Sequence, residues 1–278
     1  MTGPLAAFHL GPLTVYWYGI ILMTGALVSG YVASLEAKRR GEKEDHVWNM
    51  LVIVVLLGIV GARLYHVFSS PAGGNVGWSY YRQHPAAIFY VWDGGLGIYG
   101  AIIGGLVGIL LYTYRAKLSL LRYVDIGAPA LLLGQAIGRW GNFANQELYG
   151  PPTTLPWGIS IDPYHRIPPF NDLIKYPLAT RFQPDFLYES LWNMVGCILL
   201  LVVGRKLAGK LKEGDLFLAY LIWYPLGRLW VESLRPDAWR IDNIPTAQII
   251  SAILIVIAAA LLAIRHISPA QPRPAEQG

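Results

Sequence analysis

Charged and amide side chains gather at the end of one long apolar segment of this sequence. Arg139 follows the apolar run, and Asn142 and Glu147 come shortly after it. A charge at the centre of a bilayer costs at least ~2.5–3.5 kcal/mol, so such residues normally face a bundle interior or an aqueous cavity. The alternative is a snorkelling arginine beside a polar helix end, because a long side chain can carry its charge to the interface. Residue type alone leaves both interpretations open.

A second charged group, formed by Arg228, Glu232 and Arg235, lies in a later apolar segment. Spacings of four and three residues place all three on one face of a helix. An ion pair between Arg228 and Glu232 would neutralise those two charges but would leave Arg235 unexplained. If two arginine-bearing helix ends meet, their guanidiniums can hold a phosphate in bidentate fashion. The two groups together therefore predict an anion site, with an anionic lipid headgroup as its ligand.

Tyr99 lies in a glycine-rich stretch, residues 92–105, which contains six glycines. Each glycine weakens a helix by ~1 kcal/mol relative to alanine, which indicates close packing against another backbone. The Tyr99 hydroxyl can donate or accept a hydrogen bond or act as a base, or it can be a hydrogen-bonded core group without a chemical role. Glu189, near the start of another apolar segment, is predicted to be the structural partner of an arginine rather than a catalyst.

The composition places these residues in a membrane protein. Of the 278 residues, 54% are hydrophobic and 14% are charged, against roughly 25% charged in an ordinary soluble domain. Disorder, a disulfide scaffold and most soluble folds are thereby excluded. The six histidines and the single Cys197 have no metal-ligand spacing, so no metal site is predicted.

Seven segments are apolar enough to cross a bilayer, which takes ~20 residues of helix because only a helix satisfies its own backbone in lipid. The sequence therefore predicts an all-α polytopic membrane protein with about seven transmembrane helices. The predicted spans are residues 15–35, 47–68, 86–112, 123–137, 186–203, 216–234 and 244–264.

The basic residues in the connecting segments predict the orientation of these spans. Of the 22 Lys and Arg residues, thirteen fall on one side of the spans and six on the other, and Arg63, Arg139 and Arg228 lie within or at the ends of apolar segments. This asymmetry predicts the N-terminus outside and the C-terminus inside. It also accounts for most of the net charge of +5 without a nucleic-acid partner.

The segment between the fourth and fifth spans cannot be a membrane helix. Residues 140–185 are rich in proline, glycine and aromatic residues and are predicted to form an ordered extracytoplasmic subdomain. Residues 1–267 are predicted to form a single integral membrane domain. The proline-containing residues 268–278 are predicted to form a disordered cytoplasmic tail.

The polar stretch after the fourth span carries a long and specific motif. Residues 138–150, GRWGNFANQELYG, closely resemble the G-R-x-G-N-F-x-N-x-E-x-x-G signature of the prolipoprotein diacylglyceryl transferase family. Other stretches agree in the same order, and the resemblance covers about residues 11–262. These stretches are residues 16–19, 61–63, 92–95 and 227–232, with Arg235 and Asp237.

The resemblance implies a seven-span, N-out enzyme of the bacterial cytoplasmic (inner) membrane. Members of the family transfer the diacylglyceryl group of phosphatidylglycerol to the thiol of the lipobox cysteine in a prolipoprotein signal peptide. The reaction forms a thioether, releases glycerol phosphate and is the first step of bacterial lipoprotein maturation. Because the thiol belongs to the substrate, the enzyme needs no cysteine of its own, and the resemblance implies no cofactor.

By the same resemblance, two arginines would hold the phosphate while other motif residues surround it. Tyr99 stands where some members of the family carry a histidine, which puts a histidine base in doubt here. The proton acceptor can be Tyr99, Glu147 or another carboxylate, or the cationic field alone can activate the thiol. The phosphate-binding residues would be Arg139 and Arg228, with Asn142, Glu147, Gly150, Tyr18, Tyr224 and Glu232 around them.

A different class of function stays open at this point. A non-enzymatic anionic-lipid-binding protein or a transporter could also use an arginine-lined site. Transport would require a continuous polar path across the bilayer, whereas the polar groups here concentrate at the outer ends of the predicted spans. That distribution favours lipid chemistry near the membrane surface.

Overall fold

The computed structural model describes residues 5–11, 13–69, 77–236, 240–242 and 244–267. The predicted tail and Asp237 lie outside these residues. Six of the described helices are long and apolar enough to cross a membrane, so the predicted all-α polytopic membrane protein is confirmed. They are α1 (Trp17–Arg39), α2 (Glu44–Phe68), α4 (Ile98–Arg115), α5 (Leu120–Ala144), α6 (Asp185–Lys206) and α8 (Thr246–Ile267).

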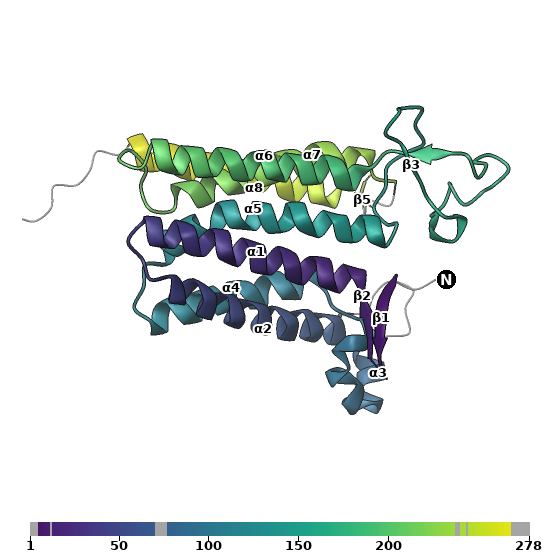
Figure 1. The fold of residues 1–278 in the computed structure, drawn as a ribbon, viewed down its shortest axis with the longest axis horizontal. Coiled ribbons are helices and arrows are strands. Elements are labelled where there is room, and N and C mark those ends of the chain that lie inside the picture. The colour runs from purple at the N-terminus through teal and green to yellow at the C-terminus, as the bar shows by residue number, and fades with distance from the viewer. Residues whose placement is uncertain (1–4, 12, 70–76, 237–239, 243, 268–278) are drawn as a thin grey trace, which may run out of the picture. The chain divides into compact units, whose positions relative to one another are not determined.

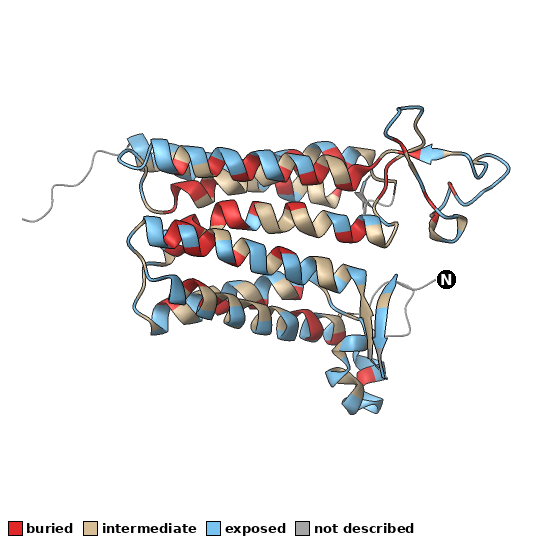
Figure 2. Cartoon of the chain, viewed as in Figure 1, coloured by how far each residue is buried: buried red, intermediate tan, exposed pale blue. Residues whose placement is uncertain are grey.

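The helix that occupies the sixth predicted span, α7 (Asp215–Leu234), is not among these six, and the charged residues Arg228 and Glu232 lie within it. Large apolar side chains on the spanning helices are exposed, for example Ile253 and Val256 on α8. Figure 2 shows such exposed surface along α6 and α8. Apolar surface of this extent is expected of helices that face lipid rather than water.

Two predicted boundaries were wrong. The third predicted span starts at residue 86, but α4 begins only at Ile98. The residues before it form two short 3-10 helices, and Gly94 and Gly95 then take φ values of +83° and +72°, a conformation that ends a right-handed helix. The fourth predicted span stops at residue 137, whereas α5 continues to Ala144. The two short helices are η1 (Pro85–Phe89) and η2 (Val91–Asp93).

The described residues divide into two compact units. Unit 2 comprises residues 8–15 and 26–126, and its helices α2 and α4 pack so closely that side chains would not fit between them. A Cβ on Gly61 would collide with the carbonyl oxygen of Gly100, and one on Gly104 would collide with that of Leu57. Unit 2 also contains the short helix α3 (Trp78–Gln83) and most of the hairpin β1 (Ala6–Leu10) and β2 (Leu13–Tyr16). The predicted single membrane domain over residues 1–267 stays a prediction.

Unit 1 comprises Tyr16, residues 17–25 of α1 and the described residues from Gly127 on, together with residues 5–7. Its helices α5, α6 and α7 enclose an apolar cluster, and α8 packs against α7. At one end of these helices lies a subdomain without α-helix, residues 145–184 (Figure 1). We call this end of unit 1 the subdomain end. The apolar cluster consists of Ala128, Leu132, Cys197, Leu200 and Leu216.

The subdomain is ordered by its own core and by one buried arginine. The antiparallel strands β3 (Ile159–Ser160) and β4 (Arg181–Phe182) pair within it, next to the short helix η3 (Pro163–His165). The Arg166 guanidinium lies 5.1 Å above the Phe182 ring and donates hydrogen bonds to backbone carbonyls that include those of Ile161 and Tyr176. The core residues are Tyr149, Ile161, Phe170 and Phe182. A second hairpin, β5 (Arg240–Ile241) and β6 (Ile244–Pro245), precedes α8.

Candidate anion site at the subdomain end of unit 1

The C-terminal end of α5 brings a carboxylate back onto the helix. The Gln146 N–H donates to the Phe143 carbonyl and the Glu147 N–H donates to the Asn142 carbonyl, both at 3.0 Å, with Gln146 at a φ of +52°. These are the two hydrogen bonds of a Schellman motif, which closes a helix by reversing the chain. The reversal lets Asn142 Nδ2 donate to Glu147 Oε1 at 2.8 Å.

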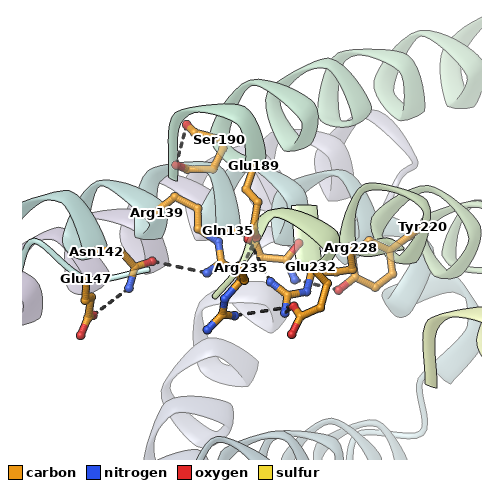
Figure 3. Close-up of polar contacts among 11 residues, drawn as sticks. Gln135, Arg139, Asn142, Glu147, Glu189, Ser190, Tyr220, Arg228, Glu232 and Arg235 are labelled. Atoms are coloured by element: carbon orange, nitrogen blue, oxygen red, sulfur yellow. Dashed lines mark hydrogen bonds and ion pairs between the residues drawn. The ribbon is translucent and has the colours of Figure 1, made fainter. Parts of the chain in front are cut away.

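Arg139 lies one helical turn before this motif and contacts Asn142 of its own helix and Glu189 of α6. Its Nη1 donates to Asn142 Oδ1 at 3.4 Å, and its Nη2 lies 2.8 Å from Oε2 of Glu189, near the start of α6. The contact between Arg139 and Glu189 is an ion pair, whereas Glu189 Oε1 accepts a hydrogen bond from Arg228 Nη1 of α7 at 2.9 Å. One buried carboxylate therefore joins the two arginines that the sequence predicts to act together (Figure 3).

The charged residues at the C-terminal end of α7 continue the network, and Arg235 follows the last residue of that helix in an extended conformation. Arg228 Nη2 donates to Glu232 Oε2, and Arg235 Nη1 lies 3.6 Å from the same oxygen. The ion pair between Arg228 and Glu232 that the sequence allowed is therefore present. It is not the only ion pair of Arg228 among the described residues, because Glu189 binds the same guanidinium. Figure 3 shows the side chains of α5, α6 and α7 converging here.

The carboxylates of the network are buried, and its guanidiniums are partly exposed. The side chains of Glu189 and Glu232 are 7% and 5% exposed, against 14–19% for the three arginines. Three guanidiniums thus meet two carboxylates through ion pairs. A guanidinium has five N–H donors, and the contacts of Arg139 and of Arg228 with described residues engage two groups each. The arrangement can therefore bind an anion. We name Arg139, Glu189, Arg228, Glu232 and Arg235 the arginine cluster.

A symmetrical contact between α6 and α7 sets the positions of Glu189 and Arg228. Trp192 Nε1 donates to the Trp223 carbonyl at 3.0 Å, and Trp223 Nε1 donates to the Trp192 carbonyl at 3.1 Å. The two rings stack with centroids 4.5 Å apart. Trp192 fills the space over Gly227, and Trp223 fills the space over Gly196. We call these four residues the tryptophan clasp, and it fixes the register of the two helices one turn from the ion pairs.

Three other predicted residues lie around α5, α6 and α7. The Tyr18 ring of α1 covers Gly141, where an ideal Cβ would lie 2.7 Å from Cδ2 of that ring. Gly150 donates its N–H to the Gln183 carbonyl at 2.9 Å, and a Cβ there would lie 2.5 Å from Oδ1 of Asp185. Tyr224, one turn before Arg228, stacks on Tyr220 with centroids 5.9 Å apart.

Tyr99 belongs to unit 2. It lies in the first turn of α4, is 45% exposed and packs on Tyr65 of α2, with ring centroids 5.7 Å apart. The structure therefore gathers the predicted residues of α5 and α7 into one network and places Tyr99 in the other unit.

Arg63 is the third arginine embedded in an apolar segment, and its surroundings are different. Its guanidinium donates to the carbonyls of Ala87, Ile88, Gly94 and Gly95 at 2.5–3.0 Å and lies 5.3 Å above the Tyr81 ring. These carbonyls belong to the segment between α3 and α4. Arg63 therefore organises the non-helical backbone of unit 2.

Sequence reasoning underrated Glu189. Its predicted role as the partner of an arginine is confirmed, but it binds two arginines, one from each side. The sequence signal was present in the single carboxylate that enters the span, whereas the identity of its partners depends on how α5, α6 and α7 pack. Among the described residues, no group of three or more His, Cys, Asp or Glu side chains is placed to hold a metal ion.

The fold and the site thus define a polytopic membrane protein with a buried arginine cluster between three helices. The family model for prolipoprotein diacylglyceryl transferase matches residues 5–264. A phosphatidylglycerol--prolipoprotein diacylglyceryl transferase of Chloroflexus aggregans is 43% identical over 93% of this chain and 87% of its own length. Proteins of the same name from Halalkalibacterium halodurans and Bacillus licheniformis are 40% and 41% identical, over 95% and 94% of this chain and 90% and 92% of theirs.

These matches extend over nearly the whole chain, including the arginine cluster and the subdomain. The chain belongs to the prolipoprotein diacylglyceryl transferase family.

Proposed function

We propose that this protein transfers the diacylglyceryl group of phosphatidylglycerol to the lipobox cysteine of prolipoprotein signal peptides. One observation carries the proposal: Glu189 holds Arg139 and Arg228 together. A phosphodiester headgroup is an anion and accepts bidentate hydrogen bonds from guanidinium. The two guanidiniums therefore match the phosphate of the donor lipid in sign of charge and in hydrogen-bonding pattern.

The reaction is a displacement at carbon. The cysteine sulfur attacks the glycerol carbon that bears the phosphate, so a C–S bond forms while the bond from that carbon to the phosphate oxygen breaks. The bonding electrons pass to the oxygen, and glycerol phosphate leaves with one more negative charge than the diester had. Arg139 and Arg228 stabilise this growing charge in a site from which water is largely excluded.

The thiol proton must be accepted as the sulfur attacks. Glu147 is the carboxylate of the site that hydrogen-bonds to a neutral amide, Asn142, and among the described residues it forms no ion pair with an arginine. Glu189 and Glu232 are committed to guanidiniums. We assign Glu147 the proton, while Tyr99 orients the substrate or relays that proton.

The remaining predicted residues bind the donor lipid around its phosphate. Asn142 holds Arg139 and Glu147 in place, and Arg235 adds a third guanidinium through Glu232. Tyr18 and Tyr224 lie on the helices beside the cluster, and Gly150 of the subdomain packs against Asp185 at the start of α6. These positions support the assignment of all five residues, Asn142, Arg235, Tyr18, Tyr224 and Gly150, to lipid binding.

The proposal includes a topology. The chain crosses the bacterial cytoplasmic membrane seven times, with α7 as one of the spans, the N-terminus outside and the C-terminus inside. The arginine cluster and the subdomain then face the outer surface, where a signal peptide presents its cysteine. The excess of Lys and Arg in the predicted inside segments supports this orientation.

The deciding experiment combines the purified full-length protein with phosphatidylglycerol vesicles and a synthetic lipobox peptide. We expect a peptide whose mass increases by one diacylglyceryl group, and no product from the same peptide with serine in place of cysteine. An unmodified peptide, together with tight retention of phosphatidylglycerol by the protein, would overturn the transferase proposal in favour of lipid binding alone.

A further inference from the structure

A polar layer lies between the arginine cluster and the apolar cluster of unit 1. Gln135 precedes Arg139 by four residues on α5, and Asn193 follows Glu189 by four residues on α6. Each therefore lies on the same helix face as its cluster residue, one turn or about 5.4 Å farther from the subdomain end. On α7, Tyr220 lies two turns from Arg228 and hydrogen-bonds to Gln135. We call Gln135, Asn193 and Tyr220 the polar layer.

The next turn beyond this layer is apolar. Cys197 follows Asn193 by four residues, Leu132 precedes Gln135 by three, and both belong to the apolar cluster. The polar layer is thus a boundary, with charge on one side and hydrocarbon on the other. Buried polar groups in such a position must form hydrogen bonds with one another or with a ligand that enters from the side of the arginine cluster.

Two atoms of the layer lack a partner among the described residues. Asn193 is 1% exposed, and its Nδ2 has no hydrogen-bond acceptor. Gln135 Nε2 lies 2.9 Å from the Tyr220 hydroxyl, while its Oε1 is buried without a donor. Because a tyrosine hydroxyl can donate as well as accept, the Gln135 amide can turn about its terminal bond, bond through Oε1 and present Nε2 instead.

Both amides can thus offer an N–H at the same depth, one turn from the phosphate-binding guanidiniums. A diacyl phospholipid held there by its phosphate carries two ester carbonyls on the adjacent glycerol carbons. Ester carbonyls accept hydrogen bonds and cannot donate them, which is the complement of two free N–H groups. The hydrocarbon chains beyond the esters would then reach the level of the apolar cluster.

We propose that Gln135 and Asn193 form an ester-binding subsite that recognises the diacylglycerol part of the donor lipid. This inference rests on the proposed function, since it takes the lipid phosphate to lie at the arginine cluster. Its consequence is selectivity: the enzyme distinguishes diacyl from dialkyl lipids, because an ether oxygen in place of an ester removes the carbonyl acceptor.

The test compares two donors with the same headgroup and chain length, diacyl phosphatidylglycerol and its dialkyl ether analogue. For each protein preparation, kcat/KM for lipobox-peptide modification is measured with both lipids, and their ratio is taken. We expect the wild type to prefer the ester by about tenfold, as two hydrogen bonds to carbonyls would give. In Asn193→Leu and in Gln135→Leu the ratio should fall at least about threefold.

The ratio is insensitive to the fraction of folded protein, because both lipids are measured on one preparation. Cys197→Ala is the matched control, since it alters the same face of α6 one turn away and leaves both amides unchanged. Its ratio should equal that of the wild type. A wild type that uses both lipids equally, or variants that lose activity toward both in the same proportion, would overturn the subsite.

A binding measurement separates this inference from the transferase proposal. The detergent-solubilised wild type is offered an equal mixture of the two lipids, and the retained lipid is identified by native mass spectrometry. Enrichment of the diacyl lipid that is lost in Asn193→Leu supports the subsite even if no peptide is modified. Equal retention of both lipids means that the buried amides bind water only, and the subsite is then refuted whatever the activity.

Discussion

Arg63 in unit 2 and the arginine cluster in unit 1 put the same residue type to opposite uses. Arg63 donates to four backbone carbonyls and covers a tyrosine ring, so its hydrogen bonds hold the segment between α3 and α4 in place. Arg139 and Arg228 share one carboxylate, and in the proposed function their other N–H groups bind the lipid phosphate. An embedded arginine is therefore not in itself a functional site, and its partners decide between structure and chemistry.

The strongest test of this contrast removes the guanidiniums of the cluster. We expect Arg139→Ala and Arg228→Ala each to lower kcat/KM for peptide modification by ~10³ or more, because each loses a group that stabilises the leaving phosphate. Activity is measured by mass spectrometry of the peptide in reconstituted membranes, and folding by the thermal unfolding of the same preparation. Normal turnover in either variant would remove that arginine from the phosphate site.

The converse test replaces Arg63. In Arg63→Met, four carbonyls lose their donor, and we expect unfolding to become easier by about 3 kcal/mol or more. Thermal unfolding and limited proteolysis measure this loss, and the folded fraction should retain kcat/KM within a few-fold of wild type. A variant of normal stability that has lost its turnover would show that Arg63 takes part in the reaction.

Two substitutions, one in each unit, test which residue takes part in the proton transfer. We expect Glu147→Gln to lower kcat by ~10², as the loss of a general base does, and Tyr99→Phe to lower it less, by about tenfold. Both substitutions preserve shape, so the unfolding temperature should not change. An inactive Tyr99→Phe beside an active Glu147→Gln would reverse the assignment, and unchanged turnover in Tyr99→Phe would eliminate that residue.

The smallest expected effect concerns the tryptophan clasp, which positions the cluster without contacting substrate. Gly196→Ala places a methyl group against the Trp223 indole, and we expect a loss of about 1–3 kcal/mol in stability together with a several-fold lower kcat. Gly127→Ala on α5 is the control, because a Cβ there meets open space and alanine favours a helix. Equal behaviour of the two variants would show that the clasp does not set the register of α6 and α7.

The sequence predicted most of what is local. Apolar runs located the helices, and the spacing of Arg228 and Glu232 placed them correctly on one face of α7. The prediction that Arg235 shares this helix face was wrong, because α7 ends at Leu234 and Arg235 is extended, although its Nη1 still lies 3.6 Å from Glu232. The predicted start of α4 was wrong because residues 86–97 are largely apolar, whereas the positive φ angles of Gly94 and Gly95 prevent a continuous helix there. The end of α5 was missed because Arg139 and Asn142 look like the edge of a span, although they continue the helix.

The partners within the site could not be predicted in the same way. Glu189 lies 39 residues from Arg228 in the chain, and its pairing with Arg139 joins two different helices. No periodicity relates such residues, because their distance depends on how α5, α6 and α7 pack. Gln135 Oε1 and Asn193 Nδ2, which lack a hydrogen-bond partner among the described residues, are also a property of packing, since a partner is present or absent only once neighbouring helices are in place.

The amino-acid sequence by itself determined that this is a polytopic membrane protein, which arginines are embedded, and which family the motif at residues 138–150 resembles. Hydropathy and short-range spacing carry that information because each helix must satisfy its own backbone in lipid. Only the tertiary structure decided that Glu189 joins Arg139 to Arg228 while Arg63 binds carbonyls. A buried charge takes the partner that packing brings to it, and that partner distinguishes an anion site from a structural arginine.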